Sequence, residues 1–191
     1  MVDTPARADA ARNREKILDT AKRVFAERGV DVPLDTLAKE ARVGPGTLYR
    51  HFPGREALVA ALVSAELDNL ERSFVALRQA DLDAAEKLER WSAALRGWMT
   101  SYVGLPEPLR DALSHGSGGL ADKCELVIAW TEELVQAGRT AGVVNDFVTG
   151  REFYRAALGL AWVTSKVGAP DGPELDGLRC MVREGWHRAS G

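Results

Sequence analysis

The chain of 191 residues has only two cysteines, Cys124 and Cys180, which lie far apart in the sequence. It has no Cys-x-x-Cys pair and no Cys/His spacing typical of a metal site, so we predict two free thiols and no metal. It also has no Ser/His/Asp set and no glycine-rich phosphate loop. These absences argue against an enzyme, and we predict no cofactor.

The sequence also lacks a long apolar run. Its longest stretch, residues 156–163, has the length of a core segment, whereas a membrane helix needs about 20 apolar residues. A charged stretch follows Met1, where an export signal would have an apolar core. We therefore expect a cytoplasmic protein with no membrane partner.

The composition is that of a folded globular protein, with 46% hydrophobic and 28% charged residues. The formal net charge is -3, but it is unevenly distributed: residues 1–60 carry 11 Lys/Arg against 9 Asp/Glu, and the remainder carries 14 against 19. This asymmetry fits a protein whose N-terminal end alone contacts phosphate, and it predicts weak non-specific DNA binding.

Apolar residues recur at helical spacing along the chain, without the sustained alternation of strands, so we predict an all-α fold of about nine helices. The expected order is a helix ending at Gly29, short helices over 34–41 and 45–51, and a long helix after 53–54 with two apolar stripes. Later helices are expected over 120–138, 150–166 and 173–188. The capping pairs Asp83/Glu86 and Thr149/Glu152 each open a helix. We predict a DNA-binding domain over 1–54 and a larger helical domain over 55–191.

The most informative segment is 33–52, PLDTLAKEARVGPGTLYRHF, which is followed by PGREAL. A helix-turn-helix needs a short helix, a tight turn and a second helix whose first residues reach base edges in the major groove. Thr47 and Tyr49 are the candidates for base contact, and Tyr49, His51 and Arg55 can donate to phosphate. The full set of predicted DNA-binding residues is Thr36, Gly44, Pro45, Gly46, Thr47, Tyr49, Arg50, His51 and Arg55.

Residues 11–62 resemble the DNA-binding domain of the TetR family, above all in V-x-x-G-T-L-Y-x-H-F followed by a basic residue and E-A-L. The resemblance implies that Thr47, Tyr49, His51 and Arg55 lie on the operator. At position 42, where the family often has glycine, the chain has Arg42. A non-glycine residue in a left-handed turn there costs about 1 to 2 kcal/mol. Gly44 replaces the usual hydroxyl N-cap.

The resemblance also implies an effector pocket in the helical domain, although aromatic residues at this spacing are more often plain core. The candidate pocket residues are Trp91, Trp98, Met99, Tyr102, Trp130 and Trp162. It further implies a homodimer, built here from the helices over 120–138 and 150–166. The candidate interface residues are Val127, Leu134, Ala156, Gly159 and Val163.

We therefore expect a repressor that binds a palindromic, double-stranded operator as a homodimer and is released by a small molecule of unknown identity. One alternative is a regulator of the same fold that activates, or that responds to a protein or to thiol oxidation. The other is a helical enzyme or binding module with a vestigial DNA head.

Overall fold

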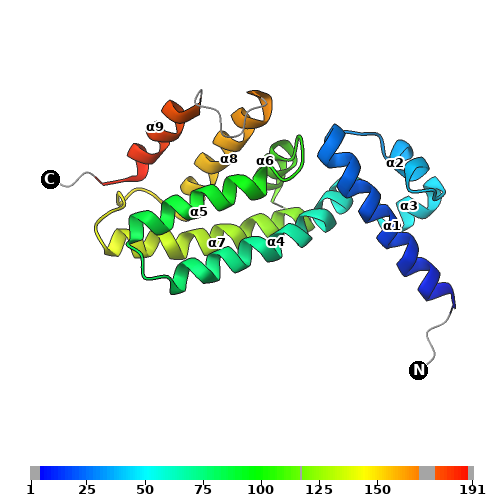
Figure 1. The fold of residues 1–191 in the computed structure, drawn as a ribbon, viewed down its shortest axis with the longest axis horizontal. Helices are drawn as coiled ribbons and strands as arrows, with labels where there is room; N and C mark the ends of the chain where they lie inside the picture. The colour runs from blue at the N-terminus through cyan, green and yellow to red at the C-terminus, as the bar shows by residue number, and fades with distance from the viewer. Residues whose placement is uncertain (1–4, 117, 168–174, 189–191) are drawn as a thin grey trace.

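The computed structural model describes residues 5–116, 118–167 and 175–188. Three helices form an N-terminal head at one end of an elongated molecule (Figure 1): α1 (Pro5–Arg28), α2 (Leu34–Glu40) and α3 (Pro45–His51). Residues Ile17 and Phe25 of α1 are fully buried with Leu37 of α2 and Leu48 of α3 in the same core cluster. As predicted, α1 ends before Gly29, whose φ of +89° suits a residue without a side chain.

The long helix α4 (Arg55–Gln79) connects the head to the rest of the protein. Its first half buries Leu58 and Leu62, and its second half buries Leu70, Phe74 and Leu77. One helix therefore contributes to both ends of the core, as the two predicted apolar stripes require. Ala65, which we expected in the same stripe as Leu58 and Leu62, is exposed.

The body contains α5 (Ala84–Met99), α6 (Pro106–His115), α7 (Gly119–Thr140), α8 (Gly150–Val167) and α9 (Asp176–Trp186). Helices α4, α5 and α7 pack side by side, and α8 covers α5 and α7 and carries α9 (Figure 1). Over the described ranges the chain forms nine helices and no strand, so the all-α prediction is confirmed. The predicted start at 173 lies outside the described residues.

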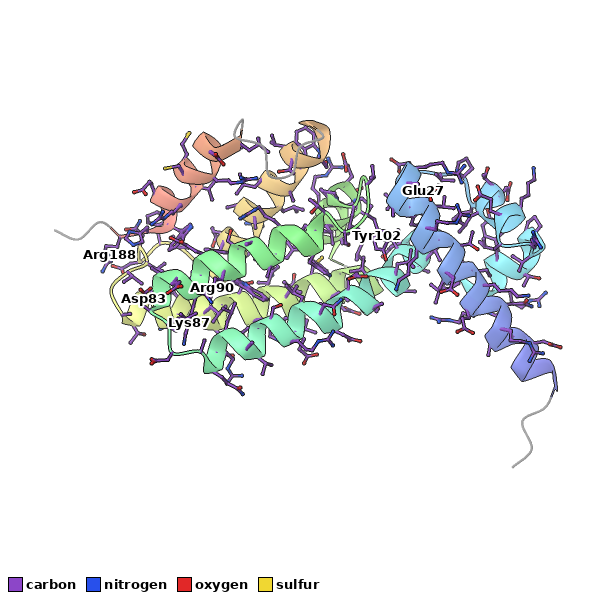
Figure 2. The ribbon with its side chains drawn as sticks, viewed as in Figure 1. Glu27, Asp83, Lys87, Arg90, Tyr102 and Arg188 are labelled. Carbon is purple, nitrogen blue, oxygen red and sulfur yellow. The ribbon has the colours of Figure 1, made fainter. Side chains whose placement is uncertain are left out.

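Both predicted capping pairs are present. The side chain of Asp83 accepts a hydrogen bond from the Glu86 amide at 2.7 Å, and that of Thr149 accepts one from the Glu152 amide at 3.3 Å. Figure 2 shows Asp83 at the end of the body far from the head. None of the helices in the described ranges is both long enough and apolar enough to cross a membrane.

Candidate nucleic-acid interface

The turn between α2 and α3 is a Schellman motif with arginine in the left-handed position. The amide of Val43 donates to the Ala38 carbonyl at 3.0 Å and that of Arg42 to the Lys39 carbonyl at 3.1 Å. Arg42 has a φ of +55° and is the one non-glycine residue with positive φ in the part of the chain described. The left-handed turn expected at position 42 is therefore confirmed, and its backbone cost is present in the native state.

The two faces of α3 have opposite characters. Leu48 is fully buried and Phe52, directly after the helix, is 2% exposed, so both hold the helix against the head. On the outer face Tyr49 is 46% exposed and Arg50 is also exposed. An exposed aromatic hydroxyl beside a guanidinium is a surface able to donate hydrogen bonds to phosphate and to base edges.

The start of α3 is small and open. Gly44 is the N-cap, with an extended backbone, and Pro45 occupies the first turn, as predicted. A Cβ at Gly46 would meet nothing within 4 Å, so this turn presents little more than backbone to its surroundings. Thr47 and His51 are half-buried beside this surface, and Thr36 is half-buried in the first turn of α2. The helix start can therefore approach another surface closely.

Arg55 is engaged within the protein. Its guanidinium Nη1 donates to the carbonyl oxygens of Val30 and, at 2.9 Å, of Val32, and the side chain is half-buried. These bonds attach the start of α4 to the loop between α1 and α2. Arg55 therefore orients the head, and the phosphate contact predicted for it stays a prediction.

The same loop also contacts the body directly. The amide of Val30 donates to the Val103 carbonyl at 2.9 Å, in the connection between α5 and α6. A Cβ at Gly29 would lie 3.2 Å from the Val103 carbonyl oxygen, so glycine permits this approach. The head is thus joined to the body at two places, through α4 and through this loop, and nothing in the sequence pattern indicated the second.

An ion-pair group connects α1 to α2. The carboxylate of Glu40 accepts hydrogen bonds from Arg23, at 2.9 Å, and from Arg28. The hydrogen bond from Arg23, followed by that from Arg28, lowers the pKa of Glu40 below its ordinary value. The group lies at the surface, so it contributes modestly to the packing of α2.

The residues predicted for an effector pocket are not gathered in one place. Trp91 is fully buried and donates from Nε1 to the Thr131 hydroxyl at 2.9 Å, while Met99 and Tyr102 are buried. Trp130 is half-buried and stacks on Phe74, with ring centroids 5.5 Å apart. Trp162 is 43% exposed on α8 and lines a surface hollow next to α6, whereas Trp98 lines a cleft between α4 and α5.

The residues predicted for a dimer interface divide into two groups. Val127 is fully buried and Leu134 is 4% exposed within the single chain, so both belong to the protomer's own core. This part of the prediction, which the resemblance implied, is corrected: these two residues of α7 pack inside the chain. Ala156, Gly159 and Val163 of α8 are exposed or half-buried and keep a surface position.

A three-helix head that displays one face of its third helix, joined by a long helix to a larger helical body, defines a helix-turn-helix transcriptional regulator. The family described as "Bacterial regulatory proteins, tetR family" matches residues 17–62. A TetR transcriptional regulator from Streptomyces coelicolor is 32% identical and has a TM-score of 0.57, and the alignment covers 93% of this chain and 99% of that one. The chain belongs to the TetR family of transcriptional regulators, which are not enzymes.

Other similarities are confined to the head or to the fold. An HTH-type transcriptional regulator of Staphylococcus aureus (strain USA300) is 40% identical over 63 residues, 32% of this chain and 34% of that protein, so the match spans about a third of this curated relative. The ketosteroid transcriptional regulator KstR2 of Mycobacterium tuberculosis has a TM-score of 0.60 at 20% identity, covering 92% and 95% of the two chains. The transcriptional regulator FadR of Bacillus subtilis, solved with stearoyl-CoA, has a TM-score of 0.61 at 19% identity, covering 89% and 95%.

Proposed function

We propose that this protein is a sequence-specific repressor that binds a palindromic operator as a homodimer in the cytoplasm and is released by a small-molecule effector. The observation that carries the proposal is that α3 has one buried face and one exposed face. Leu48 and Phe52 anchor the helix, while Tyr49 and Arg50 are displayed beyond an open Gly44–Gly46 start. A short helix fixed in this way can enter the major groove at its N-terminal end.

The proposed roles follow from position and chemistry. Thr47 and Tyr49 contact base edges, and Arg50 and His51 contact phosphate, with Gly44, Pro45 and Gly46 allowing close approach. Thr36, on the preceding helix, contacts the backbone at the groove edge. Arg55 adds a phosphate contact only through guanidinium nitrogens other than Nη1, which holds the α1–α2 loop. Residues 1–54 act as the DNA-binding domain and 55–191 as the effector-binding and dimerisation domain.

A homodimer is proposed because one seven-residue recognition helix reads too few bases for a specific site, and paired half-sites about one helical turn apart solve this problem. The exposed face of α8 supplies the interface, because Ala156 and Gly159 allow close approach of a second helix. Release follows if an effector binds more tightly to a dimer with wrongly spaced heads, since only differential affinity shifts the equilibrium. The complex of FadR with stearoyl-CoA supports the proposal that a regulator of this fold binds a small-molecule effector.

Fluorescence anisotropy with DNA from the promoter beside the gene tests the reading surface. Tyr49→Ala should weaken specific binding by about 10- to 100-fold, and Arg50→Ala should weaken specific and non-specific binding alike and reduce the salt slope by about 1. Arg90→Ala is the matched control, because Arg90 is an exposed arginine at the far end of the body, paired with Glu86 (Figure 2). Affinities equal to that of the wild type in both head variants would contradict the proposed surface.

Two further measurements separate the remaining parts of the proposal. Sedimentation of the free protein should give a dimer, and a monomer at micromolar concentration would contradict the interface. A reporter gene under the same promoter should be silenced by the protein. Increased transcription would instead identify an activator of the same fold.

A further inference from the structure

Two polar atoms at, and just after, the C-terminal end of α5 are buried without a hydrogen-bond partner. They are Nε1 of Trp98, whose side chain is 4% exposed, and Oγ of Ser101, one turn further along the chain. Native proteins satisfy nearly all such atoms with a protein group, an ordered water or a ligand. By contrast, Nε1 of Trp91, two turns earlier on the same face of α5, donates to Thr131. The unpaired indole N–H of Trp98 therefore points to an occupant from outside the chain.

Both residues line the same cleft, which lies between α4 and α5 and has a volume of about 190 Å³. The two helices run side by side in the body (Figure 1). The lining combines polar and apolar residues, and consists of Glu66, Asn69, Leu70, Ser73, Ala94, Gly97, Trp98 and Ser101. The volume is below that of a pocket for a drug-sized ligand, so the occupant is small.

The lining has a single charge, the carboxylate of Glu66. Its Oε2 accepts a hydrogen bond from the Asn69 side chain at 3.1 Å, so the carboxylate is anchored on α4. Burial, and after it the charge of Glu66, raises the pKa of Tyr102, the residue that follows Ser101. The negative potential of Glu66 therefore reaches the end of α5 where the unpaired hydroxyl lies.

We propose that this cleft binds a small amine that also carries an oxygen acceptor, and that this molecule class is the effector. The ammonium group pairs with Glu66, and the oxygen accepts from Nε1 of Trp98 and the hydroxyl of Ser101. The carbon atoms between them lie against Leu70 and Ala94. This assignment rests on the proposed function, because it names the site and the chemistry of the effector that releases the DNA.

The position of the cleft connects binding to the head. Both unpaired atoms are shielded from solvent, so a ligand that reaches them must separate α4 slightly from α5. Helix α4 begins at Arg55, which holds the α1–α2 loop of the head. A ligand that binds only the separated arrangement has the differential affinity that a change in head position requires.

Binding is tested on the full-length protein without DNA, by protein-detected NMR titration with three isosteric six-membered rings. Morpholine has the amine and the oxygen, piperidine lacks the oxygen, and tetrahydropyran lacks the amine. Morpholine should bind at least tenfold more tightly than either of the others and shift the indole N–H resonance that disappears in Trp98→Phe. Equal affinity for the three rings, or no binding of morpholine, would overturn the proposal.

Variants locate the site. Trp98→Phe keeps an aromatic ring and should weaken morpholine binding about tenfold, and Glu66→Gln should weaken it about fivefold. Trp186→Phe removes an indole N–H far along the chain on α9, outside the cleft, and should leave the affinity unchanged. Wild-type affinity in Trp98→Phe would contradict the assignment. So would a crystal grown with morpholine that showed only an ordered water between Trp98 and Ser101.

Measuring DNA binding in the presence of the rings separates the proposed effector site from the proposed DNA-binding function. If the wild type binds its promoter fragment and morpholine weakens that binding more than piperidine does, the cleft is the effector site. If morpholine binds through Trp98 but the operator complex is unaffected, the effector role is overturned while the DNA-binding function stands. If no DNA is bound at all, the proposed function fails, although the ring titration still decides whether the cleft binds its ligand.

Discussion

The head of this protein packs two very short helices against one long helix, α1, whereas the body packs longer helices against one another. The head fixes two seven-residue helices, α2 and α3, which are too short to be stable alone and depend on α1. The body uses helices of up to 25 residues and buries the largest side chains, Trp91 and Tyr154 among them. A short helix held by a few contacts can display most of its surface, whereas a long one buries a full stripe.

The two regions also differ in where their polar side chains lie and in how those side chains are hydrogen-bonded. In the head, the polar side chains of α3 are exposed or half-buried at the surface. In the body, Trp91 donates to Thr131, and the Tyr154 hydroxyl donates to Cys124 Sγ at 3.3 Å, with burial raising the pKa of Tyr154 well above its ordinary value. Polar atoms inside the body are paired in these cases, so the unpaired Trp98 N–H is conspicuous.

The largest expected effect tests whether the head depends on fewer anchors than the body. Leu48→Ala and Leu95→Ala remove the same atoms from fully buried sites, one in each region, and each should cost about 2 to 5 kcal/mol. Hydrogen exchange should show that Leu48→Ala lowers protection in residues 5–52 alone, because the body has its own core. Equal loss of protection throughout the chain in both variants would mean that head and body unfold as one unit.

A smaller effect is expected where the body packs backbone against backbone. A Cβ at Gly150, the first residue of α8, would clash with the backbone nitrogen of Glu132 in α7. Gly150→Ala should therefore force the helices apart and cost about 1 to 3 kcal/mol in chemical denaturation. Gly185→Ala in α9 is the control, since nothing lies within 4 Å of its Cβ, and it should be neutral or slightly stabilising. A neutral Gly150→Ala would show that α8 is not held as closely as the structure describes.

The third comparison uses one motif that occurs in both regions. Helix α7 ends in the same Schellman pattern as α2, with Gly142 (φ +73°) at the position that Arg42 occupies in the head. Arg42→Gly should stabilise the protein by up to about 1 kcal/mol, and Gly142→Ala should destabilise it by about 1 kcal/mol. Thermal unfolding measures both. Destabilisation by Arg42→Gly would mean that the arginine side chain contributes more than its backbone conformation costs.

The smallest effect concerns the ion pairs that hold α2 to α1. Because Arg23 and Arg28 lower the pKa of Glu40, the stability that these ion pairs contribute is present above the ordinary glutamate pKa of about 4.3 and is lost as the pH falls through the lower folded-state value. Glu40→Gln should therefore lower the unfolding temperature slightly at pH 7 and not at pH 3. Glu86→Gln, which removes the ion pair between Arg90 and Glu86 in the body, is the control. The same difference between wild type and Glu40→Gln at both pH values would contradict the assignment.

Local sequence determined much of this protein. The stop at Gly29, the left-handed turn at position 42, the proline at the start of α3 and both capping pairs were predicted correctly, because each depends on residues within one helical turn. The all-α class and the family followed from periodicity and from the motif around Thr47 and Tyr49.

Only the tertiary structure decided which distant segments of the chain contact one another. Val127 and Leu134 sit on a stripe that suits a partner as well as a core, and only the packing of α7 showed that they face inward. The sequence pattern could not predict that the Arg55 guanidinium donates to the carbonyls of Val30 and Val32. It also could not predict that the Trp98 N–H is unpaired in a cleft. The physical reason is that periodicity reports which residues are apolar, whereas hydrogen bonding and pocket formation depend on which surfaces meet.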